Sequence, residues 1–327
     1  MITSKDVALK AGVSVSTVSR AFSRPDLINQ ETRELVFKIS SQLGYIPNSN
    51  ARTLKTKKSN TVGLIISDIN NYFYLSIPRG LSLKQSNSKY HFLVSFSAEN
   101  SRIEEACIQT LLSNKSEVII FTPTGDCSEE SHRMLTNDSS LITLQLFRRK
   151  FDDINSITID DELGTYLATK ELLANGHRNI VLVDYDISIP TGRKEGYIKA
   201  FNELNIKYNV NNVIKVNVVS DFDKELFAKL DAIKPTAIIP VSNVISNSIF
   251  EYLKYRNLKI KDDISVVAYD DTDATRAMNI TSIVHPLDDL VDVVDTAIHN
   301  REMHGLIVSQ HYKIKPYLIR RESVKKI

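Results

Sequence analysis

The chain has 327 residues, 42% of them hydrophobic, and its 41 lysines and arginines against 39 aspartates and glutamates give a formal net charge of +2. This length suggests two or three domains with sizeable cores. No run reaches the roughly 18 apolar residues of a membrane span, no basic and then apolar leader opens the chain, and two cysteines give neither a disulfide framework nor a metal-ligand spacing. We expect a cytoplasmic protein without cofactor or metal.

The positive charge is concentrated near the start of the chain. Residues 1–60 contain ten lysines and arginines against four acidic residues, a net charge of +6, which leaves −4 for residues 61–327. A small basic segment joined to an acidic remainder is typical of a nucleic-acid-binding domain.

The first 20 residues have the pattern of two helices joined by a tight turn. Thr3 can cap the first helix, with Asp6 at capping-box spacing, and Gly12 tolerates the backbone conformation that ends it. Ser14 can cap the second helix, in which Val18 points inward. This arrangement predicts a helix-turn-helix, whose second helix enters the major groove of DNA.

The outer face of the second helix then carries Val15, Ser16, Ser19 and Arg20. Arg20 can pair with a guanine edge and Val15 can contact a thymine methyl group. Thr17 and Ser19 suit phosphate contacts, which position a protein on DNA without reading the sequence.

A third helix is predicted over residues 30–43, capped by Asn29 and followed by Gly44. Its spacing predicts a buried stripe formed by Leu35, Val36, Ile39 and Leu43. A small helical bundle without a DNA role is the alternative interpretation of these three helices.

A hinge is predicted after the third helix, where Pro47 and Asn48 break the chain and a helix of about seven residues follows at 49–55. So short a helix is well below the ~12–15 residues needed for stability in water, so we expect it to become ordered on DNA. Two such helices in a minor groove would use Leu54 as a wedge and Ala51 for close approach. Alternatively, Leu54 packs on the protein core.

Beyond residue 61, apolar runs alternate with helical patterns, which predicts parallel sheets covered on both faces. A helix is expected at 101–113 with Ser101 and Glu104 as a capping box, and another at 164–175 closed by Gly176. The predicted strands are 62–66, 92–96, 118–122, 141–144, 157–159, 180–183, 237–241, 264–269 and 312–319.

Several motifs resemble the LacI/GalR family of bacterial transcriptional repressors. The pattern D-V-A-x-x-A-G-V-S-x-x-T-V-S-R matches at every fixed position of residues 6–20, and further matches follow at 44–48, 51–54, 172–180 and 263–271. The resemblance implies a multidomain protein with an all-α helix-turn-helix head and an α/β periplasmic-binding-protein-like core of two Rossmann-like subdomains. It also implies a homodimer on near-palindromic, double-stranded operator DNA.

The expected domains are a helix-turn-helix domain at 1–47, a hinge helix and linker at 48–60, and an effector-binding and dimerisation core at 61–327. Within the core, subdomain one is expected at about 61–175 and 288–314, and subdomain two at about 176–287 and 315–327. The candidate DNA-binding residues are Thr3, Ser4, Val15, Ser16, Thr17, Ser19, Arg20, Asn29, Tyr45, Asn48, Ala51 and Leu54.

The resemblance also implies an effector site in the cleft between the subdomains. Arg193, Asn243 and Asp270 match ligand-contact positions of sugar-responsive members, and their side chains can make paired hydrogen bonds to adjacent hydroxyls. Alternatively, Arg193 is a surface charge, Asn243 a helix cap, and Asp270 part of a turn.

Aromatic residues Tyr72, Phe73 and Phe222 complete the candidate effector site as a stacking surface, together with His285. Core packing is the alternative for Phe73 and Phe222, and a structural role for His285. His177 is expected to be structural.

These observations predict a repressor whose operator affinity is controlled by an effector, a sugar or sugar derivative, with a nucleobase or nucleoside as the alternative ligand. An enzyme on the same α/β core is disfavoured, because the phosphate-binding loops and nucleophile motifs are absent and no catalytic residue is assigned. Asp160 and Asp161 are expected to lie in a solvated loop. A sugar-binding transport protein is disfavoured by the basic head.

Overall fold

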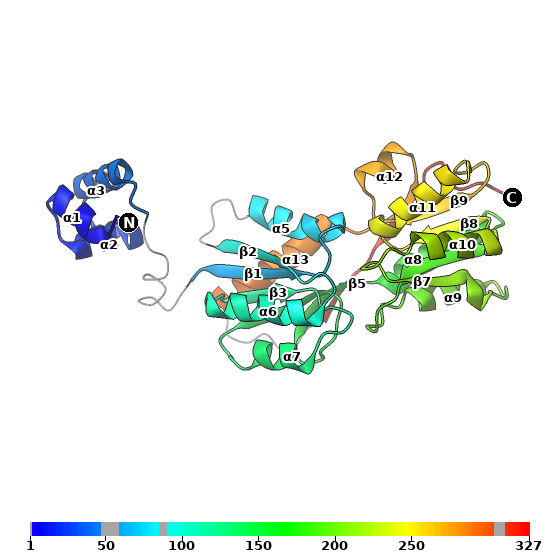
Figure 1. Ribbon diagram of the computed structural model, residues 1–327, viewed down its shortest axis with the longest axis horizontal. Coiled ribbons are helices and arrows are strands. Elements are labelled where there is room, and N and C mark those ends of the chain that lie inside the picture. Colours follow the sequence, from blue (N-terminus) through cyan, green and yellow to red (C-terminus); the bar gives the residue numbers. More distant parts are fainter. Residues whose placement is uncertain (1, 47–58, 85–89, 304–310) are drawn as a thin grey trace. The chain divides into compact units, whose positions relative to one another are not determined.

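The computed structural model describes residues 2–46, 59–84, 90–303 and 311–327, with the backbone alone for 299–303. The chain divides into two compact units, Met1–Asn60 and Thr61–Ile327 (Figure 1). The expected hinge helix at 49–55, with Asn48, Ala51 and Leu54, lies outside the described residues.

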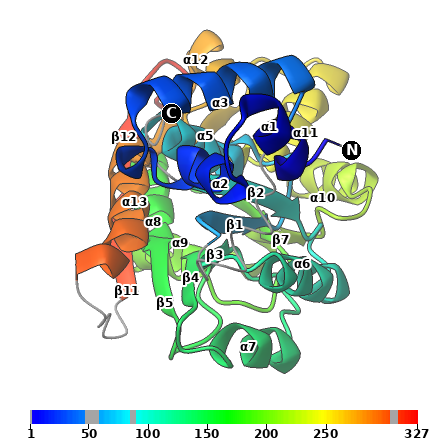
Figure 2. The ribbon, with the colours of Figure 1, turned by 90° about the vertical axis from the view of Figure 1, so that its left-hand side faces the viewer.

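Within its described residues 2–46, the first unit is a helical bundle formed by α1 (Ser4–Ala11), α2 (Val15–Ser23) and α3 (Gln30–Leu43), with a short 3-10 turn at Pro25–Leu27 (Figures 1 and 2). Small and branched side chains fill its core. The expected stripe on α3 is wrong at Leu35, which is 42% exposed because this position turns away from α1 and α2. The buried residues are Val7, Ala8, Val18, Ala21, Val36 and Ile39.

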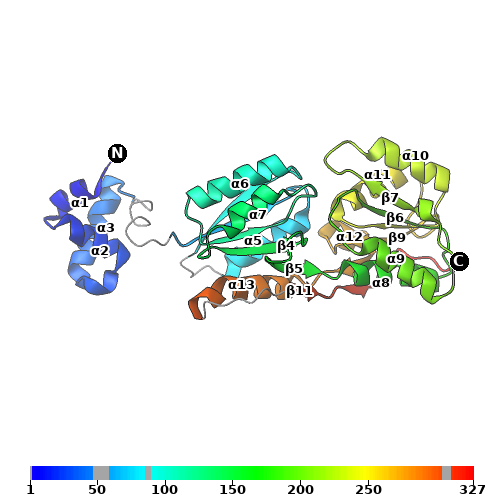
Figure 3. The same cartoon turned by 90° about the horizontal axis from the view of Figure 1, so that it is seen from below.

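The first sheet of the second unit is parallel throughout, in the order β11-β5-β4-β3-β1-β2. The helices α5 (Tyr72–Lys84) and α13 (Leu287–Met303) pack on one face, and α6 (Ser101–Ser113) and α7 (Glu129–Thr136) on the other (Figure 3). The strands are β1 (Thr61–Ile66), β2 (His91–Phe96), β3 (Val118–Phe121), β4 (Ile142–Phe147), β5 (Asn155–Ile159) and β11 (His311–Ile314).

The second sheet has the order β12-β10-β9-β8-β6-β7 and is parallel except for β12, which pairs antiparallel with β10. Its strands are β6 (Ile180–Tyr185), β7 (Val213–Val216), β8 (Ala237–Pro240), β9 (Ser265–Tyr269), β10 (Thr281–Val284) and β12 (Tyr317–Ile319). Its helices are α8 (Asp161–Ala174), α9 (Arg193–Glu203), α10 (Asp223–Ile233), α11 (Asn243–Tyr255), the short α12 (Asp273–Ala277) and a 3-10 turn at Val210–Asn212.

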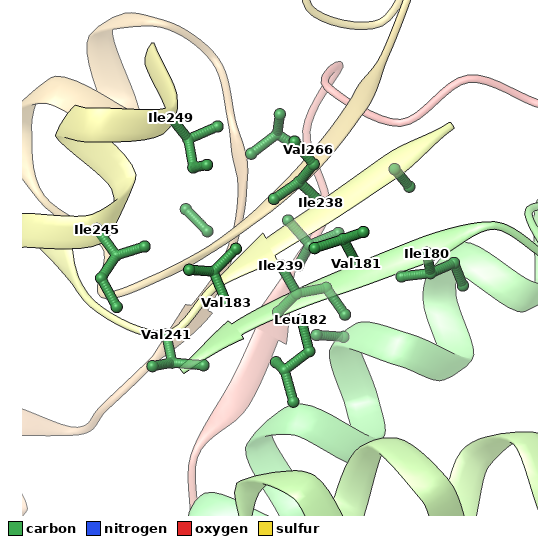
Figure 4. Close-up of a cluster of buried hydrophobic side chains, with 14 of the residues drawn as sticks. Ile180, Val181, Leu182, Val183, Ile238, Ile239, Val241, Ile245, Ile249 and Val266 are labelled. Atoms are coloured by element: carbon green, nitrogen blue, oxygen red, sulfur yellow. The ribbon is translucent and has the colours of Figure 1, made fainter. Parts of the chain in front are cut away.

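Helices cover both faces of this second sheet, with α8 and α9 on one side and α10 and α11 on the other (Figure 3). Every residue of β6, β8 and β9 is buried, as expected for parallel strands covered on both faces. Figure 4 shows part of this core, where side chains of β6 and β8 pack with Ile245 and Ile249 of α11. Burial of each such side chain stabilises the fold by about 1.5–3 kcal/mol.

The boundary between the subdomains differs from the expected one. Helix α8 was expected in subdomain one, but its Ala168, Leu172 and Leu173 belong to the core of the second sheet. The chain therefore enters the second subdomain at Asp161 rather than after residue 175. The expectation holds for α13, which packs with α5 of the first subdomain.

Three smaller expectations are also corrected. Asn100, not Ser101, caps α6, because its side chain accepts from two amides of the first turn. The predicted strand at 312–319 is two strands in different sheets, and β7 and β10 were not predicted.

In the described part of the chain, no helix combines the length and apolar character that crossing a bilayer requires.

Candidate functional site

The helix-turn-helix of the first unit is fixed by its caps. The side chain of Asp6 accepts from both the amide and the hydroxyl of Thr3 at 2.7 Å, which also lowers the pKa of Asp6. Gly12 ends α1 with a left-handed φ of 66°, and the hydroxyl of Ser14 accepts from the amide of Thr17 at the start of α2. These local bonds set the angle at which α2 leaves the turn.

Among the described residues, the outer face of α2 is exposed. Val15, Ser16, Ser19 and Arg20 are exposed, whereas Val18 is fully buried. The guanidinium of Arg20 is carried on this exposed face. A cation beside short polar side chains on an exposed helix can reach base edges and phosphates.

The other candidate DNA-binding residues of this unit have structural duties as well. Thr17 is half-buried and its hydroxyl lies 2.8 Å from that of Ser14. Thr3 and Asn29 are the N-caps of α1 and α3. Ser4 is half-buried at the start of α1, and Tyr45 packs its ring 6.0 Å from that of Phe22.

The second unit holds a small, partly open cavity of about 30 Å³ between its two subdomains. Its lining comes from segments that follow strands of both sheets, namely β1, β4, β5, β6, β8, β9 and β10. Ligands of open α/β folds bind at this edge, outside the carboxyl ends of the strands. We call this space the cleft cavity.

Arg193, at the first turn of α9, is the central cation of the cleft cavity. One terminal nitrogen lies 3.1 Å from Asp161 Oδ2 and the other 3.3 Å from Asp184 Oδ1. The guanidinium also lies 5.5 Å from the ring centres of both Tyr185 and Tyr269, within cation–π range. Both of its terminal nitrogens therefore already face carboxylates.

Close packing of α8 on α9 brings these groups together. A Cβ at Gly196 of α9 would lie 2.0 Å from the carbonyl oxygen of Glu162, so glycine is needed for the helices to approach. A Cβ at Gly164 would lie 2.2 Å from the hydroxyl of Tyr269, which donates to Asp161. The first turns of α8 and α9 therefore lie close together, and Asp161 and Arg193 can form an ion pair.

A second polar group surrounds Asp270, which follows β9. Its Oδ1 lies 3.2 Å from His285 Nε2, and its Oδ2 accepts from the backbone amide of Asn243. The side chain of Asn243 reaches across to the first subdomain and donates to the carbonyl of Asn70 at 3.2 Å. All three predicted residues are buried here.

The first subdomain contributes Arg148 and a set of aromatic rings. Arg148 forms a two-pronged ion pair with Glu99 at 2.7 and 2.8 Å and lies 3.4 Å from the hydroxyl of Tyr74. The ring of Phe73 lies 4.9 Å from those of Phe147 and His285. The rings of Phe73 and Phe147 form an apolar wall beside the charged groups.

Two strand ends at the cleft cavity are strained. Phe147 and Asp270 have φ values of 67° and 73°, a region that residues other than glycine rarely adopt. Such strain costs about 1–3 kcal/mol per residue and concentrates at ligand and active sites.

Burial shifts the protonation of these groups. Burial raises the pKa of Asp184, opposed by the charge of Arg193. Burial and the nearby charge of Glu99 raise the pKa of Asp68, at the end of β1. Burial likewise raises the pKa values of Tyr74 and Tyr185, so both hydroxyls stay protonated and can donate.

Of the seven predicted effector residues, Phe73, Arg193, Asp270 and His285 line the cleft cavity. Asn243 lies behind it, bonded to Asp270. Tyr72 is 66% exposed and does not line the cavity, and Phe222 packs against the core of the second subdomain at the start of α10.

Sequence reasoning missed Tyr74, Phe147, Arg148, Tyr185 and Tyr269 of the lining. Each lies in a strand end or in the segment that follows a strand, so the strand ends themselves were the available signal. The expected solvated loop at Asp160 and Asp161 is wrong for Asp161, which is buried because it begins α8 and pairs with Arg193.

Comparison with known proteins places the chain in a family. The model for bacterial regulatory proteins of the lacI family matches residues 3–48, and that for a periplasmic binding protein-like domain matches residues 169–324. Catabolite control protein A of Priestia megaterium is 30% identical over 296 residues, 88% of this chain and 89% of that protein.

Two further matches cover nearly the whole chain. The ribose operon repressor of Haemophilus influenzae is 26% identical over 99% of both chains. A crystal structure of the Lac repressor dimer bound to operator and the anti-inducer ONPF has the same fold, with a TM-score of 0.82 and 24% identity over 99% of both chains. The chain therefore belongs to the lacI family of bacterial regulatory proteins, DNA-binding regulators of transcription rather than enzymes.

Proposed function

We propose that this protein is a homodimeric repressor whose affinity for a near-palindromic operator is controlled by a small hydroxyl-rich ligand, a sugar or sugar derivative, in the cleft cavity. The observation that carries this proposal is a set of buried polar atoms without a partner among the described residues: Arg193 Nε, Asn243 Oδ1 and His285 Nδ1. The name of one relative, the ribose operon repressor, refers to a sugar operon.

Such atoms are expensive to leave unpaired. Each buried polar group without a hydrogen bond costs about 1–3 kcal/mol. Among the described residues, two other buried side-chain atoms that are not hydroxyls also lack a partner, in Asn212 and Asp223. Neither residue lines the cleft cavity or is bonded to a lining residue, as Asn243 is to Asp270. Ligand hydroxyls, which both donate and accept, would satisfy the three atoms of the cleft.

Ligand entry requires the two subdomains to move apart. A cavity of about 30 Å³ is far smaller than the ~300–1,000 Å³ of typical small-molecule sites. Among the described residues, hydrogen bonds bridge the subdomains across the cleft from Asn243 to the carbonyl of Asn70 and from Ser188 to the carbonyl of Gly125. Breaking these contacts and inserting a ligand would change the relation between the subdomains, and with it the DNA-binding state.

The first unit supplies the DNA contacts. Arg20 and Val15 on the outer face of α2 would read bases, while Ser16, Thr17 and Ser19 would position the helix. We extend the proposal to Asn48, Ala51 and Leu54, which would form the minor-groove hinge helix once the dimer is on DNA.

The proposed dimer has a suitable surface in the first subdomain. Strand β2 is at the end of its sheet, and Leu93 and Val94 on it are 40% and 39% exposed. An exposed apolar edge strand is prone to pair with another chain. Leu93→Lys should therefore shift the protein from dimer to monomer in analytical ultracentrifugation, and an unchanged dimer would exclude this surface.

Two experiments test the proposed function. Purified protein is first bound to DNA selected from a randomised palindromic pool, across a range of salt concentrations. A preferred sequence with a steep salt dependence is expected, because phosphate contacts release counterions. Equal affinity for a scrambled duplex at every salt concentration would contradict a sequence-specific repressor.

A thermal-shift screen with neutral sugars, sugar phosphates and nucleosides then searches for the ligand. Stabilisation of the core by a sugar, with a change in operator affinity, is the expected result. Stabilisation by a nucleobase or nucleoside alone would favour the alternative ligand, which the rings of Phe73 and Phe147 could also stack against.

A further inference from the structure

We infer that the cleft cavity selects an effector without phosphate or carboxylate groups: an uncharged or cationic hydroxyl-rich ring, such as a neutral sugar or an amino sugar. This inference rests on the proposed function and specifies the chemical class of its ligand. Three features of the cleft carry it: the occupancy of its arginines, its charge balance, and the hydrogen-bonding character of its unpaired atoms.

In both arginines of the cleft, the two terminal nitrogens that could bind an anion already face carboxylates. Arginine frequently binds phosphate or carboxylate through two parallel N–H···O bonds. Those nitrogens face Asp184 and Asp161 in Arg193, and the two carboxylate oxygens of Glu99 in Arg148. An anionic ligand would have to displace a buried carboxylate, which would then be left without its cation.

The charge balance opposes an anion as well. Four buried carboxylates lie at the cleft beside two arginines: Arg148 and Arg193 face Glu99, Asp161 and Asp184, and Asp270 is the fourth. The counter-group of Asp270 is His285, which carries charge only when protonated. Counted as formal charges, with histidine taken as neutral, these groups sum to −2, so a further anion meets repulsion in a buried, weakly screened site.

The unpaired atoms require donors more than acceptors. Because an ionised Asp270 can only accept, a neutral His285 would donate to it from Nε2 and keep Nδ1 as an acceptor. Asn243 Oδ1 is also an acceptor, whereas Arg193 Nε is a donor. A sugar hydroxyl or an ammonium group can donate to both acceptors, but an ionised phosphate or carboxylate oxygen cannot.

Calorimetry on the full-length protein with matched ligands tests the inference. The panel is glucose, glucosamine, glucose 6-phosphate and glucuronate, together with ribose, ribose 5-phosphate, adenosine and adenosine monophosphate. Within each set that binds, we expect the neutral or cationic member to bind at least about tenfold more tightly than its anionic counterpart, because like charges in a buried site cost several kcal/mol.

Variants that remove a negative charge test whether the cleft causes the discrimination between anionic and neutral ligands. Asp161→Asn and Asp184→Asn should each reduce the ratio between anionic and neutral affinities, because each variant removes a negative charge beside Arg193. Asp231→Asn is the matched control, since Asp231 pairs with Arg256 on the partly exposed surface of α10 and α11. Circular dichroism and melting curves identify which variants fold. One folded cleft variant is enough for the comparison with wild type and the control.

The outcomes separate the inference from the proposed function. Tighter binding of a phosphate or carboxylate member than of its neutral parent would overturn the inference and leave the ligand-controlled repressor standing. Equal discrimination in wild type, the cleft variants and the control would also overturn it. If no member binds although operator binding is intact, the ligand part of the proposed function fails, and the inference fails with it.

Discussion

Arg193 is the residue on which the cleft depends most. We predict that Arg193→Ala abolishes the response to ligand but leaves operator binding intact, because the DNA-binding unit is a separate compact unit. The substitution leaves Asp161 and Asp184 buried without their cation, so the free energy of unfolding of the core should fall by about 3–5 kcal/mol. Urea unfolding and operator binding with and without ligand measure both effects.

Arg193→Lys keeps the charge but not the planar fork, and should recover part of the stability and little of the response. Arg256→Ala, at an exposed ion pair with Asp231, is the control and should change stability far less, because solvent screens this pair. Loss of operator binding by folded Arg193→Ala protein would contradict the assignment of Arg193 to the ligand.

Gly196 lets α8 and α9 approach closely enough to join Arg193 to Asp161. Gly196→Ala would place a Cβ 2.0 Å from a backbone oxygen of Glu162, which cannot move without the helix. We predict a loss of about 1–3 kcal/mol in the free energy of unfolding, with a weakened ligand response. Gly125→Ala, whose Cβ would make an ordinary 3.4 Å contact with Ile187, is the comparison, and equal losses would contradict the packing argument.

At the scale of elements, His177 links the α8–β6 connection to two other segments through hydrogen bonds of its ring. It is 1% exposed, and its ring nitrogens lie 3.0 Å from the hydroxyl of Thr236, before β8, and from the carbonyl of Lys325 near the end of the chain. The predicted structural role of His177 is consistent with these contacts. Burial lowers its pKa below the ordinary 6.5, with the Lys325 carbonyl opposing the shift.

This shift gives a pH dependence with a definite sign. The folded protein holds His177 neutral while the unfolded chain takes up a proton, so its contribution to stability is complete above pH 6.5 and is lost as the pH falls below that value. His177→Gln, which cannot titrate, should therefore lose less stability than wild type between about pH 7.5 and 5.5. Urea unfolding at both pH values measures the difference, and His91→Gln on the exposed start of β2 should behave as wild type.

The helix ends show what the sequence could predict at this scale. The capping box of Thr3 and Asp6, the caps Ser14 and Asn29 and the glycine after α3 are all confirmed, because each depends on residues within four positions of one another. The cap of α6 was misplaced by one residue, since Glu104 turns inward instead and accepts from the amide of Thr124, 20 residues away.

At the scale of the whole molecule, ligand control requires the core to act on the DNA-binding unit through the chain that joins them. Leu54 lies in this connection and is the proposed minor-groove wedge. We predict that Leu54→Ala weakens binding to the selected operator by at least about tenfold while binding to scrambled DNA changes little, because the wedge acts only where the duplex is kinked. Titrations against both duplexes measure the ratio.

Leu9→Ala provides the control for this prediction, since Leu9 of α1 is 86% exposed and has no assigned DNA contact. It should leave the affinities for both duplexes unchanged. Equal weakening of specific and non-specific binding by Leu54→Ala would contradict the wedge role.

The sequence by itself determined the helix-turn-helix, the alternation of strands and helices, the basic character of the first 60 residues and the family of regulators. These properties depend on neighbouring residues or on composition. Only the tertiary structure decided which side chains meet in the cleft and to which subdomain α8 belongs. It also decided that the two arginines are paired with carboxylates. The physical reason is that the cleft cavity is built from strand ends far apart in the chain, whose juxtaposition depends on sheet order and on the close packing of α8 and α9.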